Sequence, residues 1–167
     1  MPIRLIEARD FSALHDIEDA TAKQFESIGI DAMTDLGPYS DEEMTGYVTA
    51  GLAWAATDDN DVPVGFLVAE IVDDCLYIAD VNVHPRAARR GLGRQLIDHA
   101  AAGNYPALVL TTFRDVPWNA PYYRRLGFET LADDEITPNL RAICEFQATI
   151  GLDRWPRVCM RRNLTTR

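Results

Sequence analysis

The sequence predicts a single mixed α/β domain in which helices flank a central, mostly antiparallel sheet. The chain has 167 residues, of which 47% are hydrophobic, enough for one compact domain with its own core. No repeat, low-complexity tract or linker divides it, so we expect one domain over residues 1–167. Strands follow one another as a meander in the first half, whereas strands and helices alternate in the second half.

Apolar runs separated by turn residues predict the strands. The turns at residues 58–61 and 73–74 divide three consecutive runs, which we expect to form antiparallel hairpins. In the second half, one apolar run precedes a helical segment and another follows it, which indicates a strand–helix–strand unit. The expected strands cover residues 3–6, 53–57, 62–72, 75–83, 107–112, a segment opening at Phe128, and 157–162.

Apolar residues at helical spacing predict the helices. Asp10 is suited to cap the first helix, and Ser40 with Glu43 forms a capping-box pattern at the start of the second. Residues 28–40 are expected to be loop, and Gly103 is placed to end the helix before it. The expected helices cover residues 11–25, 41 onward, 91–102, 119–126 and 139–150.

Charge is divided unevenly along the chain, whose net charge is −10. Residues 1–85 carry 18 acidic and three basic residues, whereas residues 86–167 carry 8 acidic residues and 13 arginines. A nucleic-acid-binding protein would have a broad basic face, so we expect no nucleic-acid partner. The division suits a protein that binds an anion with one half and attracts a cation with the other. Solubility alone is the alternative explanation.

The N-terminus and the cysteines predict a cytoplasmic protein. The start of the chain lacks the long apolar stretch and small-residue cleavage site of a secretory signal. No apolar run approaches the ~20 residues of a membrane span, so we expect no membrane association. Cys75, Cys144 and Cys159 have no metal-ligand spacing, so we expect incidental reduced thiols and no metal.

The segment from Val81 to Arg94 carries the clearest chemical signal. A strand leads into an arginine-rich loop, and Gly91 and Gly93 stand where that loop becomes a helix. Glycine allows a ligand to approach the backbone closely. The free N–H groups at a helix start bind phosphate, with help from the helix dipole. The segment therefore predicts a pyrophosphate site, with arginines at positions 86, 89, 90 and 94.

Two common nucleotide-binding motifs do not fit this segment. A P-loop needs Gly-Lys-Ser/Thr, and the sole lysine in the sequence is Lys23. A dinucleotide-binding fingerprint needs a third glycine three residues after Gly93, where the chain has Leu96. A helix start with solvated arginines remains the structural alternative.

The same segment resembles the phosphate motif of the GNAT superfamily of N-acetyltransferases. That motif, Gln/Arg-x-x-Gly-x-Gly/Ala, follows a strand that ends in Val-x-Pro. Here Val83-His84-Pro85 precedes Arg89-Arg90-Gly91-Leu92-Gly93-Arg94. The first motif position is Ala88 instead of Gln or Arg, so one side-chain contact is missing.

A second match lies downstream, between Asn119 and Phe128. It is similar to the family's Tyr-x-x-x-Gly-Phe signature, with Tyr123 four residues before Gly127. In the family a helix ends at this glycine and the next strand begins at the phenylalanine. The order of elements along the whole chain also matches the family, whose central sheet splays after its fourth strand.

The resemblance implies that acetyl-CoA is the co-substrate. Backbone N–H groups from the helix start would bind the pyrophosphate, and the main chain of the preceding strand would pair with the pantetheine arm. A backbone N–H of that strand would also polarise the thioester carbonyl. The residues so implied in cofactor binding are Val81, Val83, Arg89, Arg90, Gly91, Leu92, Gly93, Arg94 and Asn119.

The resemblance further implies direct transfer to a bound amine. Tyr123 occupies the family's position for the acid that protonates the departing thiolate, and a packed aromatic is the structural alternative for it. A base must deprotonate the amine before it attacks. Asp80 is the acid nearest the position that some relatives use, acting through water, and it is our candidate.

The acceptor is expected to be a small-molecule or peptide amine. Residues 10–61, which line the acceptor side in the family, hold 13 acids and one base. This charge favours a cationic small molecule, although a solvated acidic surface explains it equally. An N-acetyltransferase is the first interpretation, and a non-catalytic acyl-CoA-binding or sensing domain is the second. A nucleotide-binding module is the third. Family members often dimerise, so a homodimer is also considered.

Overall fold

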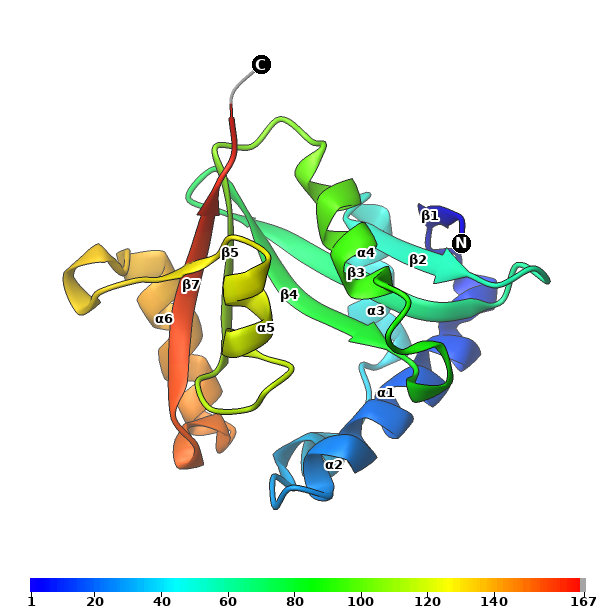
Figure 1. Cartoon of the computed structure of the whole chain (residues 1–167), viewed down its shortest axis with the longest axis horizontal. Coiled ribbons are helices and arrows are strands. Elements are labelled where there is room, and N and C mark those ends of the chain that lie inside the picture. Colours follow the sequence, from blue (N-terminus) through cyan, green and yellow to red (C-terminus); the bar gives the residue numbers. More distant parts are fainter. Residues whose placement is uncertain (166–167) are drawn as a thin grey trace. The chain divides into compact units, whose positions relative to one another are not determined.

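The computed structural model describes residues 1–165 and has the predicted mixed α/β architecture (Figure 1). Hydrogen bonds link seven strands in the order β1-β2-β3-β4-β5-β7-β6. β4 and β5 are parallel, whereas β1–β2, β2–β3, β5–β7 and β6–β7 are antiparallel. The predicted fold class, a mostly antiparallel mixed sheet flanked by helices, is therefore confirmed.

The chain forms two compact units. Unit 1 comprises Met1–Glu70 and Ala79–Ala102, and unit 2 comprises Ile71–Ile78 and the chain from Gly103 onward. Unit 1 contains β1 (Ile3–Leu5), α1 (Phe11–Glu26), α2 (Ala32–Leu36), α3 (Asp41–Thr49), β2 (Ala53–Thr57), most of β3 (Pro63–Val72), the end of β4 (Cys75–Val83) and α4 (Leu92–Ala101). Unit 2 contains the start of β4, β5 (Ala107–Phe113), α5 (Ala120–Arg125), β6 (Glu129–Thr130), α6 (Pro138–Thr149) and β7 (Arg157–Asn163).

In unit 1, β2 and β3 separate two layers of helix. Successive side chains of a strand point to opposite faces. Ala53 and Ala55 therefore face α1 and α3, in a core completed by Ile6, Phe11, Leu14, Ile17, Met44, Phe66 and Val68. Figure 1 shows α3 and α4 on opposite faces of these strands.

The other face of β2 and β3 packs against α4. Trp54 lies edge-on to His99 of α4, with ring centroids 6.1 Å apart. A Cβ on Gly65 would lie 3.1 Å from the Asn82 carbonyl oxygen and 3.5 Å from Cδ1 of Leu96. The absence of a side chain at Gly65 therefore allows α4 to pack closely on the strands that precede it.

In unit 2, α5 and α6 lie on opposite faces of the β5–β7 pair (Figure 1). β5 pairs antiparallel with β7, and Thr111 stands opposite Cys159 on the face that contacts α6. Arg162 lies on the other face, where its Nη1 donates to the Leu126 carbonyl at the end of α5. This alternation determines which β7 side chains meet which helix.

Three local expectations need correction. Residues 28–40 include a short helix, α2, which the Gly- and Asp-rich composition concealed. Asp10 makes no capping hydrogen bond to α1, because its buried carboxylate pairs with Arg4 at 2.8 Å and accepts from the Glu7 N–H. The strand expected to open at Phe128 is only the two residues of β6. The capping box of Ser40 and Glu43 is confirmed.

The hydropathy of the helices bears on membrane insertion. Within residues 1–165, none of the helices combines the length and the apolar character that crossing a bilayer requires.

Candidate functional site

The start of α4 offers backbone N–H groups to a ligand. Gly91 is the N-cap and has φ 72°, a left-handed conformation, and no side chain caps the helix. The first backbone hydrogen bond of α4 runs from Gln95 N–H to the Gly91 carbonyl. The N–H groups of the first turn therefore have no partner within the helix. This is the geometry in which helix N-termini bind phosphate groups.

Arginines surround this helix start. Arg89, with φ 63°, and Arg90 are exposed, and neither pairs with a carboxylate within residues 1–165. Arg94 lies 3.5 Å from Asp98, one turn along α4, with both side chains more than half exposed. The two unpaired guanidinium groups add positive charge where the helix dipole is already positive. The segment therefore fits a pyrophosphate.

β4 delivers the chain to this helix start. Val81 and Val83 are half-buried near its end, and the N–H of His84 donates to the Val64 carbonyl of β3 at 2.8 Å. The Nδ1 atom of His84 accepts a hydrogen bond from the Arg86 N–H. His84 thereby caps the short 3-10 turn Pro85–Ala87. His84 is thus a turn residue between β4 and α4.

Unit 1 also contains a cluster of carboxylates and tyrosines, the acid–tyrosine cluster: Glu18, Tyr39, Tyr47, Glu70 and Asp80. The Oε1 atom of Glu18, on α1, accepts a hydrogen bond of 3.1 Å from the Tyr39 N–H. The Tyr47 hydroxyl of α3 donates to Glu70 at 3.2 Å, and the two tyrosine rings meet edge-on at 5.7 Å. Four elements and the loop before α3 therefore bring carboxyl groups and aromatic surface to one place.

Burial raises the pKa of two carboxyl groups of this cluster, Glu18 and Asp80. It raises the pKa of Glu18 to about 8, and the charge of Asp80 adds to the shift. It also raises the pKa of Asp80 to about 6, although hydrogen bonds from Asn82 and the Val81 backbone oppose the shift. Perturbed carboxyl groups of this kind are common at catalytic sites, because burial keeps a base near its working pH.

Glu18 is the residue that sequence analysis missed. Its Oε2 atom is buried and accepts no hydrogen bond within residues 1–165. The signal was present, since Glu18 follows the buried Leu14 by four residues and the buried Ile17 by one, at the edge of the apolar stripe of α1. An acid at that spacing faces the interior more than the solvent.

Tyr123 lies in unit 2 on α5, where it is 7% exposed. Its ring packs edge-on against Phe128 at 5.7 Å and against Tyr122 at 5.5 Å. Gly127, with φ 92°, ends the turn after α5, and the Phe128 N–H donates back to the Tyr123 carbonyl. The helix end and the glycine are therefore placed as predicted, and the ring of Tyr123 packs against two aromatic neighbours.

Asn119 is the N-cap residue of α5. Its side chain makes no capping hydrogen bond, and its Oδ1 atom is buried without a hydrogen-bond partner within residues 1–165. An unsatisfied buried carbonyl oxygen costs about 1–3 kcal/mol. A ligand amide or hydroxyl that donated to this atom would remove that cost, so Asn119 fits a role in cofactor binding.

A polar network of unit 2 surrounds Thr111 of β5. Thr111 contacts the Tyr77 hydroxyl at 3.0 Å and donates to Oε1 of Gln147 at 3.0 Å. Arg157 donates to Thr111 and Gln147, and its guanidinium stacks over Phe113 at 4.6 Å. The groups that meet Thr111 are thus hydroxyls, an amide and a guanidinium, which supply no carboxylate base.

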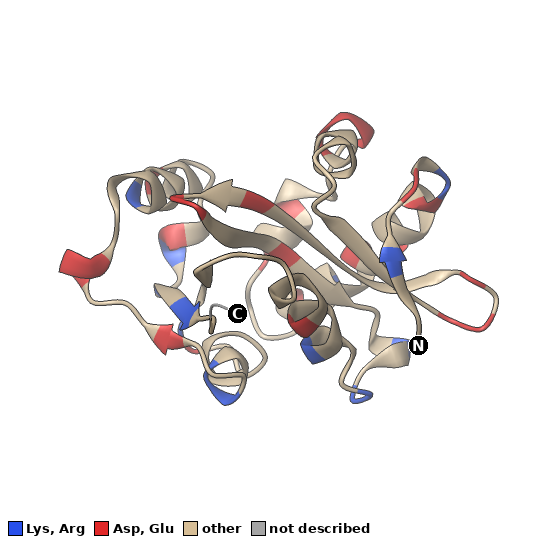
Figure 2. Ribbon diagram, turned by 90° about the horizontal axis from the view of Figure 1, so that it is seen from above, with Lys and Arg blue, Asp and Glu red and all other residues tan. Residues whose placement is uncertain are grey.

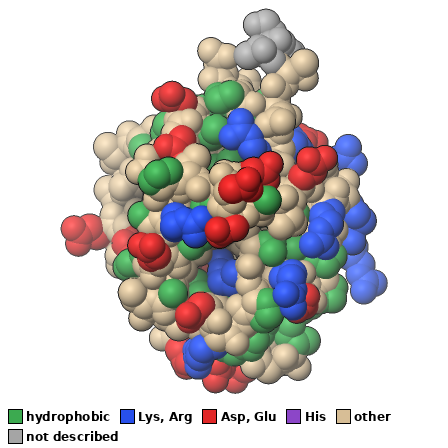
Figure 3. All heavy atoms as spheres, turned by 90° about the vertical axis from the view of Figure 1, so that its left-hand side faces the viewer, with side chains coloured by type: hydrophobic (Ala, Val, Ile, Leu, Met, Phe, Trp, Pro, Cys, Tyr) green, Lys and Arg blue, Asp and Glu red, His purple; other side chains and the backbone are tan. Residues whose placement is uncertain are grey.

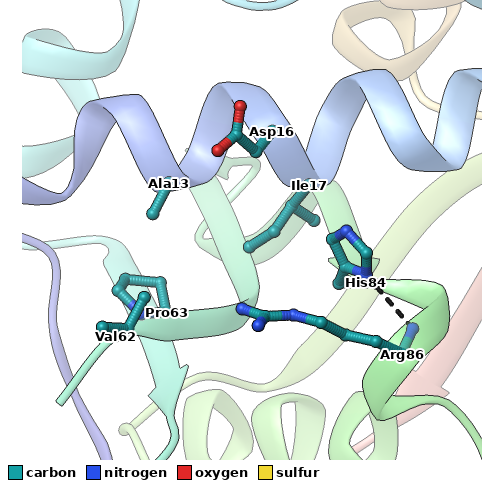
Figure 4. A pocket seen from close by; sticks show the side chains of 7 residues that line it. All are labelled: Ala13, Asp16, Ile17, Val62, Pro63, His84 and Arg86. Carbon is teal, nitrogen blue, oxygen red and sulfur yellow. Dashed lines mark hydrogen bonds between the residues drawn. The ribbon is translucent and has the colours of Figure 1, made fainter. Parts of the chain in front are cut away.

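A pocket of about 310 Å³ lies in unit 1 beside α1. Figure 4 shows Asp16 on the helix above it and the Arg86 side chain extended along its floor towards Pro63. Arg86 of the predicted pyrophosphate segment lines it, whereas Asp80 and Tyr123 do not, so we assign the pocket no part in acetyl transfer. The lining residues are Ala13, Asp16, Ile17, Val62, Pro63, His84 and Arg86.

The charges follow the division seen in the sequence. Acidic segments mark the N-terminal helices and the hairpin between β2 and β3 (Figure 2). On the face that Figure 3 shows, basic, acidic and hydrophobic side chains are interspersed. That face therefore offers no continuous basic surface of the kind that nucleic-acid-binding proteins use.

Solved structures share this fold at low sequence identity. The Neisseria gonorrhoeae N-acetylglutamate synthase in complex with coenzyme A and N-acetyl-glutamate is 18% identical with TM-score 0.71, covering 98% of this chain and 35% of the synthase. The chain thus spans about a third of that protein. The PaiA N-acetyltransferase of Thermoplasma acidophilum in complex with coenzyme A is 14% identical with TM-score 0.69, covering 97% of this chain and 98% of that one. The ribosomal-protein-S18-alanine N-acetyltransferase of Escherichia coli is 18% identical with TM-score 0.65. The match covers 99% of this chain and 95% of that enzyme.

A family model identifies the segment that carries both sequence motifs. Residues 49–130 match the acetyltransferase (GNAT) domain. This range includes the end of β4, the start of α4 and the whole of α5. Residues 49–130 of this chain are thus similar to the GNAT acetyltransferase domain, the family that both sequence motifs indicated.

Proposed function

We propose that this chain is an acetyl-CoA-dependent N-acetyltransferase that moves an acetyl group directly to a primary amine of a cationic small molecule. The observation that carries the proposal is the uncapped start of α4, at Gly91, inside the segment that matches the family. Solved relatives of the same fold are complexes with coenzyme A, which supports this choice of donor. Residues 1–167 would act as one functional domain.

Donor binding rests on main-chain groups of unit 1. N–H groups of Leu92, Gly93 and Arg94 would donate to the pyrophosphate, while Arg89 and Arg90 would neutralise its charge. The main chain of Val81 and Val83 would pair with the amides of the pantetheine arm and orient the thioester. In unit 2, Asn119 would accept a hydrogen bond from the cofactor through its unsatisfied Oδ1 atom.

Two proton transfers complete the reaction. An alkyl amine is mostly protonated near neutral pH and cannot attack a thioester until it loses that proton. Asp80 would accept it through water, since a base with pKa about 6 is largely ionised at neutral pH. Tyr123 would donate its hydroxyl proton to the departing thiolate.

The acid–tyrosine cluster supports a cationic acceptor. A cation that approached Asp80 would also meet Glu18, Glu70 and the rings of two tyrosines. Carboxylates attract an ammonium group, and tyrosine faces add a cation–π contribution of about 0.5–2 kcal/mol. An ammonium ion nearby would also favour ionisation of Glu18 and would donate to its buried Oε2 atom, which has no hydrogen-bond partner within residues 1–165.

Ligand-dependent thermal stability tests the choice of donor. Acetyl-CoA should raise the Tm of the protein, because a ligand that binds only the folded state stabilises it. ATP and NAD at the same concentration should have little effect. An equal or larger shift with either of them would favour a nucleotide-binding module instead.

An acetylation screen tests the acceptor class. Polyamines and aminoglycosides should be acetylated faster than amino acids and peptide N-termini of lower positive charge. Activity confined to neutral or anionic amines would contradict the cationic acceptor and leave the transferase proposal intact. Acetyl-CoA binding without acetylation of any amine would instead favour the non-catalytic acyl-CoA-binding domain.

A further inference from the structure

Two thiols from different elements of unit 2 are in contact. Cys144 lies on α6 and is half-buried, while Cys159 lies on β7 and is 5% exposed. Their Sγ atoms are 3.3 Å apart. The third thiol, Cys75, is buried at the start of β4, where its Sγ atom lies 3.6 Å from Nη1 of Arg161. Cys144 and Cys159 are thus a pair, which their spacing in the sequence did not reveal.

The fold holds this pair in register. Cys159 stands opposite Thr111 in the β5–β7 ladder, so its side chain points to the face that α6 covers. Gln147, three residues after Cys144 on α6, accepts a hydrogen bond from the same Thr111. A disulfide has an S–S length of about 2.0 Å, so a small rotation of the two side chains would be enough to form one.

The surroundings favour reaction at Cys144 first. Its hydrogen bond with Cys159 and the positive charges of Arg157 and Arg141 lower its pKa, despite some burial. The same contact and burial raise the pKa of Cys159. The thiolate is the reactive form of cysteine, so the half-exposed Cys144 is the nucleophile and the buried Cys159 is the second thiol.

We propose that Cys144 and Cys159 are an oxidisable dithiol, which hydrogen peroxide or another hydroperoxide converts to an intramolecular disulfide that joins α6 to β7. Such a modification site is separate from the acetyl-transfer residues, and it goes beyond the expectation that all three cysteines are incidental. The disulfide would fix α6 against β7 beside the hydrogen bonds of Thr111, Gln147 and Arg157.

The chemistry balances in two steps. The Cys144 thiolate attacks one oxygen of the peroxide, the O–O bond breaks, and Cys144 becomes a sulfenic acid while hydroxide leaves. The Cys159 sulfur then attacks the Cys144 sulfur, the S–O bond breaks, and the hydroxyl leaves as water with the Cys159 proton. The two thiols lose two electrons and the peroxide gains them. A dithiol reductant reverses the change.

Peptide mapping of the intact folded protein tests the proposal. The reduced protein is treated with hydrogen peroxide, remaining thiols are alkylated after unfolding, and trypsin is added. Cleavage after arginine places the two thiols in separate peptides, Ala142–Arg154 and Val158–Arg161. We expect these peptides to be joined, with the loss of two hydrogen atoms, and Cys75 to remain alkylated. Complete alkylation of Cys144 and Cys159 after peroxide treatment would overturn the proposal.

Two variants test the order of reaction. In Cys159→Ser the sulfenic acid at Cys144 has no second thiol, so a sulfenic-acid probe such as dimedone should label Cys144. In Cys144→Ser the same probe should leave Cys159 unlabelled, because that thiol is buried. Cys75→Ser is the matched control and should form the disulfide normally. Labelling of Cys159 instead of Cys144 would contradict the assigned roles.

A measurement of thermal stability tests the proposal on wild-type protein and does not require any variant to fold. Oxidised wild-type protein should unfold several degrees above the reduced protein, because the bond closes a loop of the chain and restricts the unfolded state. The reductant should restore the original Tm. An oxidised protein that contains the joined peptides but unfolds below the reduced protein would show that the folded structure does not accommodate this bond, which would overturn the proposal.

Discussion

At the scale of single residues, the account depends most on the hydroxyl of Tyr123. Replacing it in Tyr123→Phe keeps the ring that packs on Phe128 and removes the proposed acid. We expect kcat to fall about 100-fold or more, with acetyl-CoA affinity nearly unchanged. Tyr122→Phe, on the adjacent residue, is the control and should retain activity. An unchanged rate in Tyr123→Phe would remove this residue from the mechanism.

The role proposed for Asp80 as the base predicts that kcat/KM depends on pH. Only its ionised form accepts a proton, so kcat/KM should fall as the pH drops below the Asp80 pKa of about 6. In Asp80→Asn the rate should be low at every pH and this acidic limb should disappear. The exposed Asp59 provides a control, because Asp59→Asn removes the same charge in unit 1 outside the acid–tyrosine cluster. An acidic limb that persists in Asp80→Asn would assign the base elsewhere.

The raised pKa of Glu18 predicts a pH dependence of stability opposite in sense to that of an ion-paired acid such as Asp10, whose pKa is lowered. Its pKa is raised from 4.5 to about 8 on folding, so its protonated form favours the folded state. This contribution is fully present below pH 4.5 and is lost as the pH rises through about 8. Between about pH 5 and about pH 8, the Tm of wild-type protein should therefore fall more steeply than that of Glu18→Gln. Parallel Tm profiles would show that Glu18 is solvated.

At the scale of elements, the start of α4 makes the sharpest prediction. Gly91 and Gly51 both have φ 72°, and a Cβ at either would meet no close atom. Alanine at either position should therefore cost about the same stability, ~1 kcal/mol, through backbone strain alone. Acetyl-CoA affinity should fall several-fold in Gly91→Ala and not in Gly51→Ala. Equal affinities, measured by calorimetry, would mean that the helix start does not bind the donor.

The sequence predicted most elements because their signals are local. The β4–α4 connection followed from Val83-His84-Pro85 and from the two glycines, and the capping box of Ser40 and Glu43 depends on four consecutive residues. The errors arose where tertiary contacts override local preference. Asp10 resembles a cap in sequence, but Arg4 from the preceding strand binds its carboxylate instead.

At the scale of the whole molecule, the sequence predicted the fold class, the family and the part of each unit that carries a motif. It did not predict the acid–tyrosine cluster, because Glu18 becomes buried only when Tyr39 and Tyr47, from later segments, pack beside α1. It did not predict the Cys144–Cys159 pair either, since that contact requires α6 to cover one face of β7. The residues proposed for catalysis and cofactor binding remain predictions until they are tested by substitution.

Acetyl transfer itself is the measurement that tests the central claim most directly. The protein is mixed with acetyl-CoA carrying a deuterated acetyl group and with a polyamine, and mass spectrometry follows the amine while a thiol reagent follows coenzyme A. We predict that the labelled acetyl group appears on a primary amine, with one free thiol released for each acetyl group transferred. Binding of acetyl-CoA without labelled product from any amine in the screen would contradict the account.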